Sequence, residues 1–499
     1  HLIRIPFQLI VRPPNLQLPS PCASSPLLYH MSQLMCKQPP SAVRSQRKRP
    51  ATKHNLPPRR IGQRTHGTSR RIRLPVLTAK IMVLLSACIA FEAGLFLVFR
   101  DWMIPFLLLI ARFFIIAGVV QLLGIPTQWI KQCYIVRARA VLRRFPHLTV
   151  IGITGSYGKT SVKTFVAHIL SAKYRVATTP KNINTEIGVA KHILQNDFKN
   201  IQVFVVEMGA YRIGEIQKIC TMVEPRIGVL TGINEQHISL FGSLEHTQQA
   251  KYELLRSLPS NGLAVVNSDS PLARDRVGGL AATVKTYGTD PDMKPTLLIE
   301  EVRTSTDGIV VRLRYHDETR TFQTSLLGAH NAHNIAAAII VADFMDMTLP
   351  VIHERVKSLS PPERTMQRRR YGKAIVLDDS YNANPDGFLA ALDVISTFPS
   401  KHRRIVITRG IPELGEKSDS IHERVGGAIA YTADVLVIVA RDFEDPIRAG
   451  IGKKYSTEIL IRDTEASLCA YLRTLQDTEC VILIENRIPD GAYQELLSP

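Results

Sequence analysis

The sequence predicts an α/β protein, with a P-loop central domain and a Rossmann-like C-terminal domain preceded by a transmembrane helical hairpin. From residue 147 onward, short apolar runs typical of buried strands alternate with helical stretches. A glycine-rich turn joins the first of these runs to a helix, and two earlier runs are long enough to span a membrane. The chain divides into a basic Pro/Ser/Arg-rich disordered tail (1–78), the hairpin with a basic connector (79–146), the central domain (147–357) and the C-terminal domain (358–499).

The positive charge of the 499-residue chain is concentrated in the tail. The formal net charge is +19, yet the first 80 residues hold 15 lysines and arginines and no acidic residue. The remainder holds 47 basic and 43 acidic residues. Because the tail lacks a sustained apolar period, it buries too little surface to offset the entropy of ordering. A nucleic-acid-binding arm is the alternative interpretation, but the balanced charge of the remainder argues against a nucleic-acid partner.

Two apolar runs, 81–99 and 103–124, are each long enough to cross a hydrocarbon core of about 30 Å. Basic residues flank the outer ends of the pair, so both ends are expected in the cytoplasm, with the following domains at the cytoplasmic face of the cell membrane. We therefore expect membrane attachment through residues 81–124; a signal peptide or a buried soluble hairpin is the alternative. Residues 129–146, with Trp129 and several arginines, are expected to form a basic interfacial helix. The seven scattered cysteines contain no C-x-x-C pair, consistent with a reducing cytosol.

The central domain opens on a glycine-rich turn with the sequence Thr154-Gly155-Ser156-Tyr157-Gly158-Lys159-Thr160-Ser161. A strand, a glycine loop and a helix together form a cradle for phosphates, because backbone N–H groups can approach the oxyanions closely. Lys159 is placed to reach the outer phosphates, and the Thr160 hydroxyl is placed to ligate Mg²⁺. Ile153 stands where the general P-loop pattern has a glycine, and a simple strand–helix turn is the alternative. We predict that these eight residues bind ATP.

Further candidate ligands follow later strands of this domain. The strand candidates are residues 148–153, 175–179, 202–207, 226–231 and 263–267. Glu207 ends one of them, and a carboxylate there can hold Mg²⁺, although a capping or salt-bridged glutamate is the alternative. His237 lies in a loop after another strand and is a candidate ligand or base. Lys251 lies on a helical stretch, where a lysine is normally a solvated charge.

Several motifs follow one another along residues 148–430 at characteristic intervals. Besides the glycine-rich turn they are Asn182-x-Asn184-Thr185-Glu186-Ile187-Gly188-Val189, Glu207-Met208-Gly209-Ala210, His237-x-x-x-Phe241-Gly242-Ser243, Ala250-Lys251, Gly328-Ala329-His330-Asn331-x-x-Asn334 and Asp378-Asp379-Ser380-Tyr381-Asn382-Ala383-Asn384-Pro385. In this order they resemble the Mur ligase family. The resemblance is greatest to members that add D-alanyl-D-alanine to the UDP-N-acetylmuramoyl tripeptide of peptidoglycan precursors.

The resemblance implies roles for individual residues of the central domain. Lys159 and Thr160 would bind the ATP phosphates and one Mg²⁺, with Glu207 and His237 as further metal ligands. Lys251 falls where the family has a lysine carbamylated by CO₂, and the resulting anion would support a second Mg²⁺. The cofactors implied are therefore ATP, two Mg²⁺ ions and a carbamylated lysine.

The resemblance also implies nucleotide and substrate contacts outside the glycine-rich turn. Asn331 and Asn334 fall on the helix start that lies beside the adenine in the family. Asn184 and Thr185 fall on the substrate side. Asp379, at the end of a strand of the C-terminal domain, is the candidate for a ribose or adenine contact, although Asp and Asn are also ordinary turn formers.

The C-terminal domain begins after a Pro-containing hinge at 358–363, which ends the preceding helix. Arg364 matches the family's interdomain arginine, which approaches the phosphates when the domains close, and completes the candidate catalytic set with Lys159, His237 and Lys251. The loop 409–411 departs from the family pattern, because relatives commonly have Gly-Asp-Met where this chain has Arg-Gly-Ile.

The reaction implied is ATP-dependent amide ligation through an acyl phosphate, with a small-molecule carboxylate donor and a D-Ala-D-Ala-like amine. Peptidoglycan members of the family carry a soluble N-terminal domain that grips the UDP-sugar, and here the tail and the hairpin stand in that place. The donor therefore remains open among a UDP-muramoyl peptide, a lipid-linked precursor, a folate and a polyamide. The alternative from another class is a membrane-tethered P-loop ATPase without ligase activity, which has no need of a carbamylatable Lys251.

Overall fold

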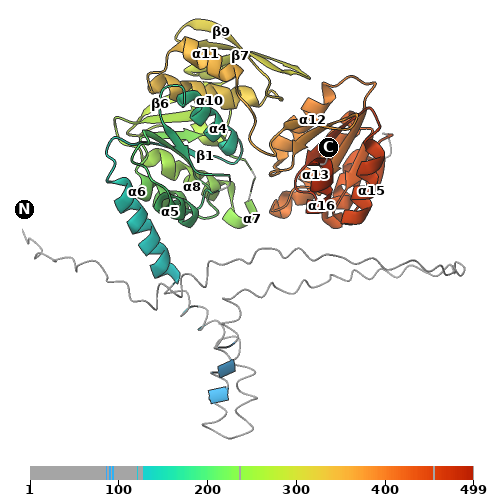
Figure 1. Cartoon of the computed structure of the whole chain (residues 1–499), viewed down its shortest axis with the longest axis horizontal. Helices are drawn as coiled ribbons and strands as arrows, with labels where there is room; N and C mark the ends of the chain where they lie inside the picture. Colours follow the sequence, from blue (N-terminus) through green and yellow to red (C-terminus); the bar gives the residue numbers. More distant parts are fainter. Residues whose placement is uncertain are drawn as a thin grey trace, which may run out of the picture. The chain divides into compact units, whose positions relative to one another are not determined.

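The structure is a computed structural model, and it describes residues 127–497 apart from Asn182, Glu235, His237 and 453–455, together with seven isolated positions between 86 and 121 (Figure 1). The tail and nearly all of the predicted hairpin at 81–124 lie outside these residues. Within the part of the chain that is described, no helix is both long enough and apolar enough to cross a bilayer. The chain separates into two units, His1–Thr127 and Gln128–Pro499, and the fold below is that of the second unit.

The core of the central domain is one mixed β-sheet. Its strands are β1 (Thr149–Thr154), β2 (Val176–Thr178), β3 (Val203–Glu207), β4 (Ile227–Leu230), β5 (Leu263–Asn267), β6 (Thr283–Gly288), β7 (Leu297–Ser305), β8 (Gly308–Tyr315) and β9 (Glu318–Thr324). They lie in the order β2-β3-β1-β4-β5-β6-β7-β8-β9, parallel from β2 to β7 and antiparallel from β7 to β9. The five predicted strands match β1 to β5 within about one residue and are confirmed, whereas β6 to β9 were not predicted.

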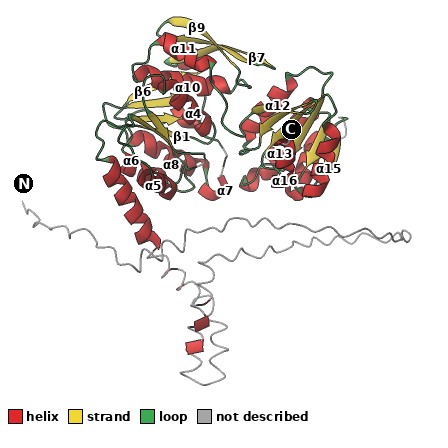
Figure 2. Cartoon of the chain, in the orientation of Figure 1, coloured by secondary structure: helices red, strands yellow, loops and turns green. Residues whose placement is uncertain are grey.

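Helices cover both faces of this sheet (Figure 2). Successive side chains of a strand point to opposite faces, so Ile151 and Ile153 belong to one buried cluster and Val150 to the other. The first cluster contains residues of α4 (Lys159–Leu170), α10 (Asn331–Phe344) and α11 (Leu349–Lys357). The second contains residues of α5 (Glu186–Gln195), α6 (Glu215–Val223) and α8 (Leu244–Arg256). The short helices of this domain are α7 (Ile238–Phe241), α9 (Pro271–Arg274) and the 3₁₀ turn η1 (Pro291–Met293).

Residues 127–142 form a helix in the region where the sequence predicts a basic interfacial helix. Its apolar face, with Ile135, Ala138 and Leu142, is buried in the cluster that also contains α5, α6 and α8. Arg139 and Arg143 each form an ion pair with Glu224, which caps the C-terminal end of α6, at 2.7 and 2.8 Å. This helix is thus packed on the central domain by one face, a contact that the sequence did not predict.

The C-terminal domain is built around a second sheet in the order β10-β11-β15-β12-β13-β14, in which only the edge strand β10 is antiparallel to its neighbour. The strands are β10 (Gln367–Tyr371), β11 (Ala374–Asp379), β12 (Arg403–Thr408), β13 (Val435–Ile438), β14 (Glu458–Ile461) and β15 (Cys480–Glu485). One face packs against α12 (Pro385–Ser396), α13 (Ser418–Thr432) and α14 (Glu444–Ile451), and the other against α15 (Glu465–Leu475) and α16 (Asp490–Leu497). Two 3₁₀ turns, η2 (Gly415–Lys417) and η3 (Arg441–Phe443), complete the domain.

Candidate active site

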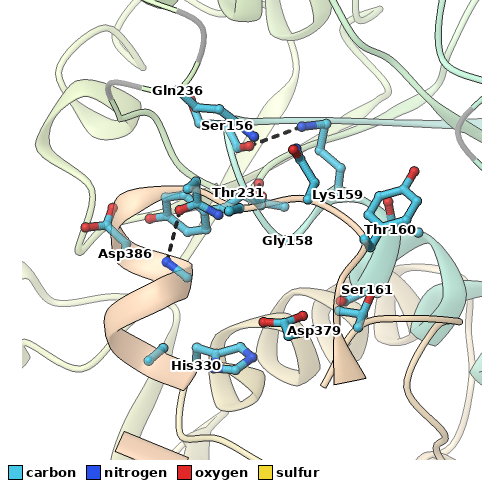
Figure 3. A pocket seen from close by; sticks show the side chains of 18 of the residues that line it. Ser156, Gly158, Lys159, Thr160, Ser161, Thr231, Gln236, His330, Asp379 and Asp386 are labelled. Carbon is cyan, nitrogen blue, oxygen red and sulfur yellow. Dashed lines mark hydrogen bonds between the residues drawn. The ribbon is translucent and has the colours of Figure 1, made fainter. Parts of the chain in front are cut away.

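A cleft of about 870 Å³ is lined by loops from both sheets (Figure 3). From the central domain come the glycine-rich turn after β1, the loops that follow β3, β4 and β5, and the start of α10. From the C-terminal domain come the loops that follow β11, β12 and β15. The loops that follow these strands lie at the carboxyl ends of parallel strands, where ligands bind in open α/β sheets. The Asn234 amide donates to Asp386 at 2.8 Å and to Asn384 at 3.3 Å, so the two domains are in direct contact at this cleft.

The glycine-rich turn has a backbone that side chains would obstruct. Gly155 has φ 149° and Gly158 has φ 73°, both in the region that favours glycine. A Cβ atom on Gly155 would collide with the Thr231 hydroxyl, and one on Gly158 would lie 2.7 Å from the Asn334 amide oxygen. Gly158 precedes α4, whose N-terminus carries no side-chain cap. The first N–H groups of α4 are therefore available to an anion in the cleft.

Two lysines donate to the same carbonyl of this turn. The Lys159 ammonium lies 2.8 Å from the Gly155 oxygen and 3.2 Å from the Ser156 oxygen, the second contact being drawn in Figure 3. The Lys251 ammonium lies 3.0 Å from the Gly155 oxygen, and this residue is only 5 % exposed. Burial, together with the charge of Lys159, holds the pKa of Lys251 well below its usual range. Burial also lowers the pKa of Lys159, against the opposing effect of Glu207.

Glu207 lies at the end of β3, 1 % exposed, and binds three side chains. Its carboxylate accepts hydrogen bonds from Thr160 at 3.0 Å, from Lys163 at 2.9 Å and from Asn184 at 3.1 Å. The alternative to a metal ligand in the sequence analysis was a salt-bridged glutamate. Glu207 does form such a salt bridge, a buried pair with Lys163. Thr160 and Glu207 nevertheless offer two adjacent oxygen atoms at the glycine-rich turn, a donor set that suits Mg²⁺ shared with phosphates.

Within the described ranges, no group of three or more His, Cys, Asp or Glu side chains is arranged to hold a metal ion. His237, which the sequence predicts as a metal ligand in the loop after β4, lies outside the described residues.

The structure brings most of the predicted nucleotide and substrate residues to the cleft. Its lining includes the predicted residues Ser156, Tyr157, Gly158, Lys159, Thr160, Ser161, Asn184, Thr185, Glu207, Asn334 and Asp379. Thr185 also caps α5 by accepting from the Gly188 N–H, a purely structural contact. Four others, Thr154, Gly155, Asn331 and Lys251, lie behind the lining: Thr154 donates to the Met208 carbonyl and Asn331 to that of Leu327.

Arg364, the predicted interdomain arginine, is also absent from the cleft lining. Its guanidinium stacks on Tyr493 of α16, 3.6 Å from the ring centroid, and its backbone has φ 58°. In this arrangement Arg364 is engaged within the C-terminal domain, and an approach to the phosphates requires it to leave Tyr493.

Comparison with known proteins agrees with this geometry. The Mur ligase middle domain matches residues 153–342, and the domain described as "Mur ligase, glutamate ligase domain" matches residues 364–484. The chain belongs to the Mur ligase family. The two matches fall on the two domains that frame the cleft.

Curated relatives of this Mur ligase include UDP-N-acetylmuramoyl-tripeptide–D-alanyl-D-alanine ligases. The one from Synechocystis sp. is 32 % identical over 312 residues, covering 61 % of this chain and 64 % of the relative. The one from Bacillus subtilis is 29 % identical over 285 residues, covering 56 % and 60 %. The chain thus spans about three-fifths of the length of these relatives.

Two solved structures show the same fold. The MurF ligase from Thermotoga maritima in complex with ADP is 25 % identical with a TM-score of 0.64, covering 74 % of this chain and 82 % of that one. The MurF structure from Acinetobacter baumannii is 22 % identical with a TM-score of 0.66, covering 74 % and 81 %.

Sequence reasoning missed several residues that line the cleft of this Mur ligase. After β5, Asp269 accepts from the imidazole of His333 at 2.7 Å, and this contact together with the Thr289 N–H and hydroxyl lowers the pKa of Asp269 to about 2, although burial opposes the shift. His330 lies nearby, where burial lowers its pKa to about 4 and its Nδ1 atom has no hydrogen-bond partner among the described residues. Asp269 and His333 are 64 residues apart in the sequence. The signals that place them at the cleft are the position of Asp269 after a parallel strand and that of His333 at the start of a helix.

Asp379, half-buried in the cleft lining, lies beside the fully buried carboxyl group of Glu485. The two residues are partners in the register of β11 and β15. Burial raises the pKa of Asp379 to about 7, and the pKa of Glu485 is held well above its usual range by burial and by the negative charge of Asp379. Neither carboxyl oxygen of Glu485 has a hydrogen-bond partner in the described part of the chain. The pair therefore resists full ionisation at neutral pH.

This pair predicts a specific dependence of stability on pH. Raised carboxyl pKa values contribute stability that is present below about pH 4 and is lost as the pH rises through the folded value near 7. In Glu485→Gln, the amide removes one charge and can donate to Asp379. We expect this variant to gain about 1–2 kcal/mol of unfolding free energy relative to the wild type between pH 5 and pH 8, measured by urea unfolding. Glu458→Gln, an exposed carboxylate paired with Arg403, is the control, and parallel curves for Glu485→Gln and the wild type would contradict the prediction.

Proposed function

We propose that this Mur ligase is an ATP-dependent amide ligase that joins the carboxylate of a UDP-N-acetylmuramoyl tripeptide to D-alanyl-D-alanine through an acyl phosphate. The observation that carries the proposal is the buried amine of Lys251 at the glycine-rich turn, 3.0 Å from the Gly155 oxygen. A site that only binds nucleotide has no need of a second buried lysine behind the turn. The substrates are those in the names of the curated relatives.

The first step would take place at the glycine-rich turn. The turn and the N-terminus of α4 would hold the ATP phosphates. The Lys159 ammonium would leave the Gly155 and Ser156 carbonyls and contact the outer phosphates. A carboxylate oxygen of the donor forms a bond to the γ-phosphorus as the bond to the bridging oxygen breaks, giving an acyl phosphate and ADP. Such a transfer depends mainly on positioning and on the neutralisation of charge.

The second step would form the amide. The amine nitrogen of D-alanyl-D-alanine attacks the acyl carbon, a tetrahedral intermediate forms, and phosphate leaves as the nitrogen loses a proton. Because the cleft is lined from both domains, the C-terminal domain can cover the acyl phosphate and protect it from water.

Two groups outside the chain itself would complete the site. Thr160 and Glu207 would hold one Mg²⁺, with His237 and Lys251 beside a second, and Mg²⁺ supplies neutralisation of the charge on the transferred phosphoryl group. Lys251 would carry a carbamate: its low pKa leaves a neutral amine, which adds to CO₂ with loss of one proton. The carbamate is an anion, whereas the unmodified amine carries no negative charge.

The test is phosphate release by the full chain with Mg²⁺ and ATP. The tripeptide donor and D-alanyl-D-alanine are offered separately and together, with mass spectrometry of the product. We expect phosphate and a new amide only when both are present. Equal phosphate release without either substrate would instead indicate an ATPase. No release, although ATP binds, would exclude this donor, and a lipid-linked muramoyl peptide would then be offered in its place.

We also propose, from the sequence, that residues 81–124 attach the chain to the cytoplasmic face of a membrane. The support is the length of the two apolar runs and the basic residues that flank them. Flotation with phospholipid vesicles tests this: the full chain should float with the vesicles in high salt, and a variant lacking 81–124 should not. A full chain that stays at the bottom of the gradient would exclude the attachment.

A further inference from the structure

Two arginines lie at the same end of the C-terminal sheet, in the lining of the cleft. Arg409 directly follows β12 and Arg487 follows β15, and these strands are parallel neighbours in which Thr408 is the partner of Glu485. Both arginines line the cleft. The last residues of the two strands are paired, so the loops that follow them begin at the same edge of the sheet. The side chains of both loops therefore lie at that edge.

The loops that carry these arginines are tied together and held in defined conformations. The Asn486 amide donates to the Gly410 carbonyl at 2.7 Å, and both residues have positive φ, 70° and 82°. The Gly410 N–H donates to the Thr408 hydroxyl at 3.0 Å, and the Ile411 N–H donates to the buried imidazole of His422 at 2.9 Å. The positions of the two arginines are therefore built by the fold and are not those of free loop ends.

Neither guanidinium group forms a hydrogen bond or an ion pair with the described residues. Both residues are exposed, and the Arg487 backbone N–H donates to the Asn486 amide oxygen at 2.7 Å. Most arginines elsewhere in this domain are paired, for example Arg403 with Glu458 and Arg473 with Glu495. Each guanidinium group is a planar fork of donors that matches an oxyanion, and the two follow neighbouring strands.

The oxyanion that fits this place best is a carboxylate of the incoming amine. The phosphates of ATP would be held on the other side of the cleft, where the glycine-rich turn, Lys159 and the N-terminus of α4 lie. An amine that attacks the acyl phosphate formed there has its carboxylate at the end of the molecule away from the reacting nitrogen, so this end would face the opposite lining, which belongs to the C-terminal domain.

We propose that Arg409 and Arg487 bind the C-terminal carboxylate of the amine substrate, so that this enzyme selects peptides with a free carboxylate over their amides. The proposal rests on the ligase function proposed above. The two arginines would determine which amine the enzyme accepts, a selection that neither the glycine-rich turn nor the metal-binding residues supply.

The experiment compares D-alanyl-D-alanine with its C-terminal amide in the phosphate-release assay of the full chain. We expect the KM of the amide to exceed that of the dipeptide by about tenfold or more. In Arg409→Gln and Arg487→Gln, the KM of the dipeptide should rise about tenfold to a hundredfold, with the KM of the amide unchanged and kcat within about twofold. The preference for the free carboxylate would then disappear. Arg424→Gln, at an exposed position of α13 away from the cleft, is the matched control and should leave every constant unchanged.

Each other outcome has a definite meaning. Equal KM values for dipeptide and amide in the wild type would overturn the proposal. A rise in the KM of ATP, with that of the dipeptide unchanged, would show that the arginines bind a phosphate. If no pair of substrates gives turnover, the ligase function fails separately, and calorimetric titration of the dipeptide and its amide into the chain still tests the arginines. Tighter binding of the dipeptide that is lost in Arg487→Gln supports the site, and binding of neither compound overturns it.

Discussion

Replacement of Lys251 by alanine is expected to lower the rate of ligation by at least about a thousandfold, because loss of an anion that supports a metal ion removes several kcal/mol of transition-state stabilisation. The fold should persist, since Lys251 forms a single hydrogen bond to a carbonyl that Lys159 also contacts. ATP binding should persist for the same reason. Phosphate release and amide formation by the full chain measure the loss, and a short carboxylic acid added to the variant should restore part of the rate.

A spectroscopic readout separates the carbamate from a purely structural role of Lys251. The chain equilibrated with ¹³C-labelled bicarbonate should show one carbamate carbon resonance that disappears in Lys251→Ala. Lys218→Ala, at an exposed position of α6, is the matched control and should keep both the resonance and the activity. Unaffected turnover in Lys251→Ala would rule out the catalytic role, and a normal loss of activity without any carbamate resonance in the wild type would rule out the modification.

Replacement of Glu207 by glutamine is expected to reduce both activity and stability. Lys163 is only 4 % exposed, and its ammonium group lies 2.9 Å from the Glu207 carboxylate. Without that carboxylate, the ammonium group would remain buried as an unpaired charge. Removal of one partner of a buried ion pair costs about 3–5 kcal/mol of unfolding free energy. Turnover should fall by at least about a hundredfold, since one of the oxygen ligands proposed for Mg²⁺ is lost, and more Mg²⁺ should be needed for half-maximal activity.

A double variant distinguishes the two effects of Glu207. In Glu207→Gln with Lys163→Met, the unpaired charge is removed, so the unfolding free energy should return to within about 1–2 kcal/mol of the wild type while turnover stays low. Glu253→Gln is the matched control, because Glu253 is also buried and accepts from the Gly214 and Gln217 N–H groups at the start of α6, away from the cleft. It should lose stability and keep activity. Recovery of turnover in the double variant would show that Glu207 acts only through the fold.

The parts of the fold that the sequence predicts are those encoded within a few neighbouring residues. Strands β1 to β5 and helix α4 are marked by apolar runs and by the glycines that interrupt them, and the glycine-rich turn is recognisable because close approach of phosphate requires Gly155 and Gly158. Strands β6 to β9 carry no comparable marker. β6 lies parallel to β5 and β7, and β7 to β9 form antiparallel pairs at the edge of the sheet. The place of these strands depends on contacts with β5 and α10 that arise only after the chain has folded.

The candidate site shows the same division. Glu207 at a strand end and Lys159 at a helix start follow from the local pattern, whereas the stacking of Arg364 on Tyr493 does not. In the sequence Arg409 is only a departure from a motif. Its relation to Arg487 depends on β12 and β15 becoming neighbours, although about 70 residues separate these strands in the chain. The Asp379–Glu485 pair likewise requires the register of two strands far apart in sequence.

The sequence by itself therefore determined the α/β class, the nucleotide turn and the membership of the Mur ligase family, because each depends on residue types at short, constant spacing. Only the tertiary structure decided the ionisation and the partners of the site residues. Lys251 is the clearest case: in the sequence it is an ordinary helical lysine, and 96 residues separate it from Gly155. Its burial against that carbonyl and beside Lys159 lowers its pKa, and burial is a property of the packed chain.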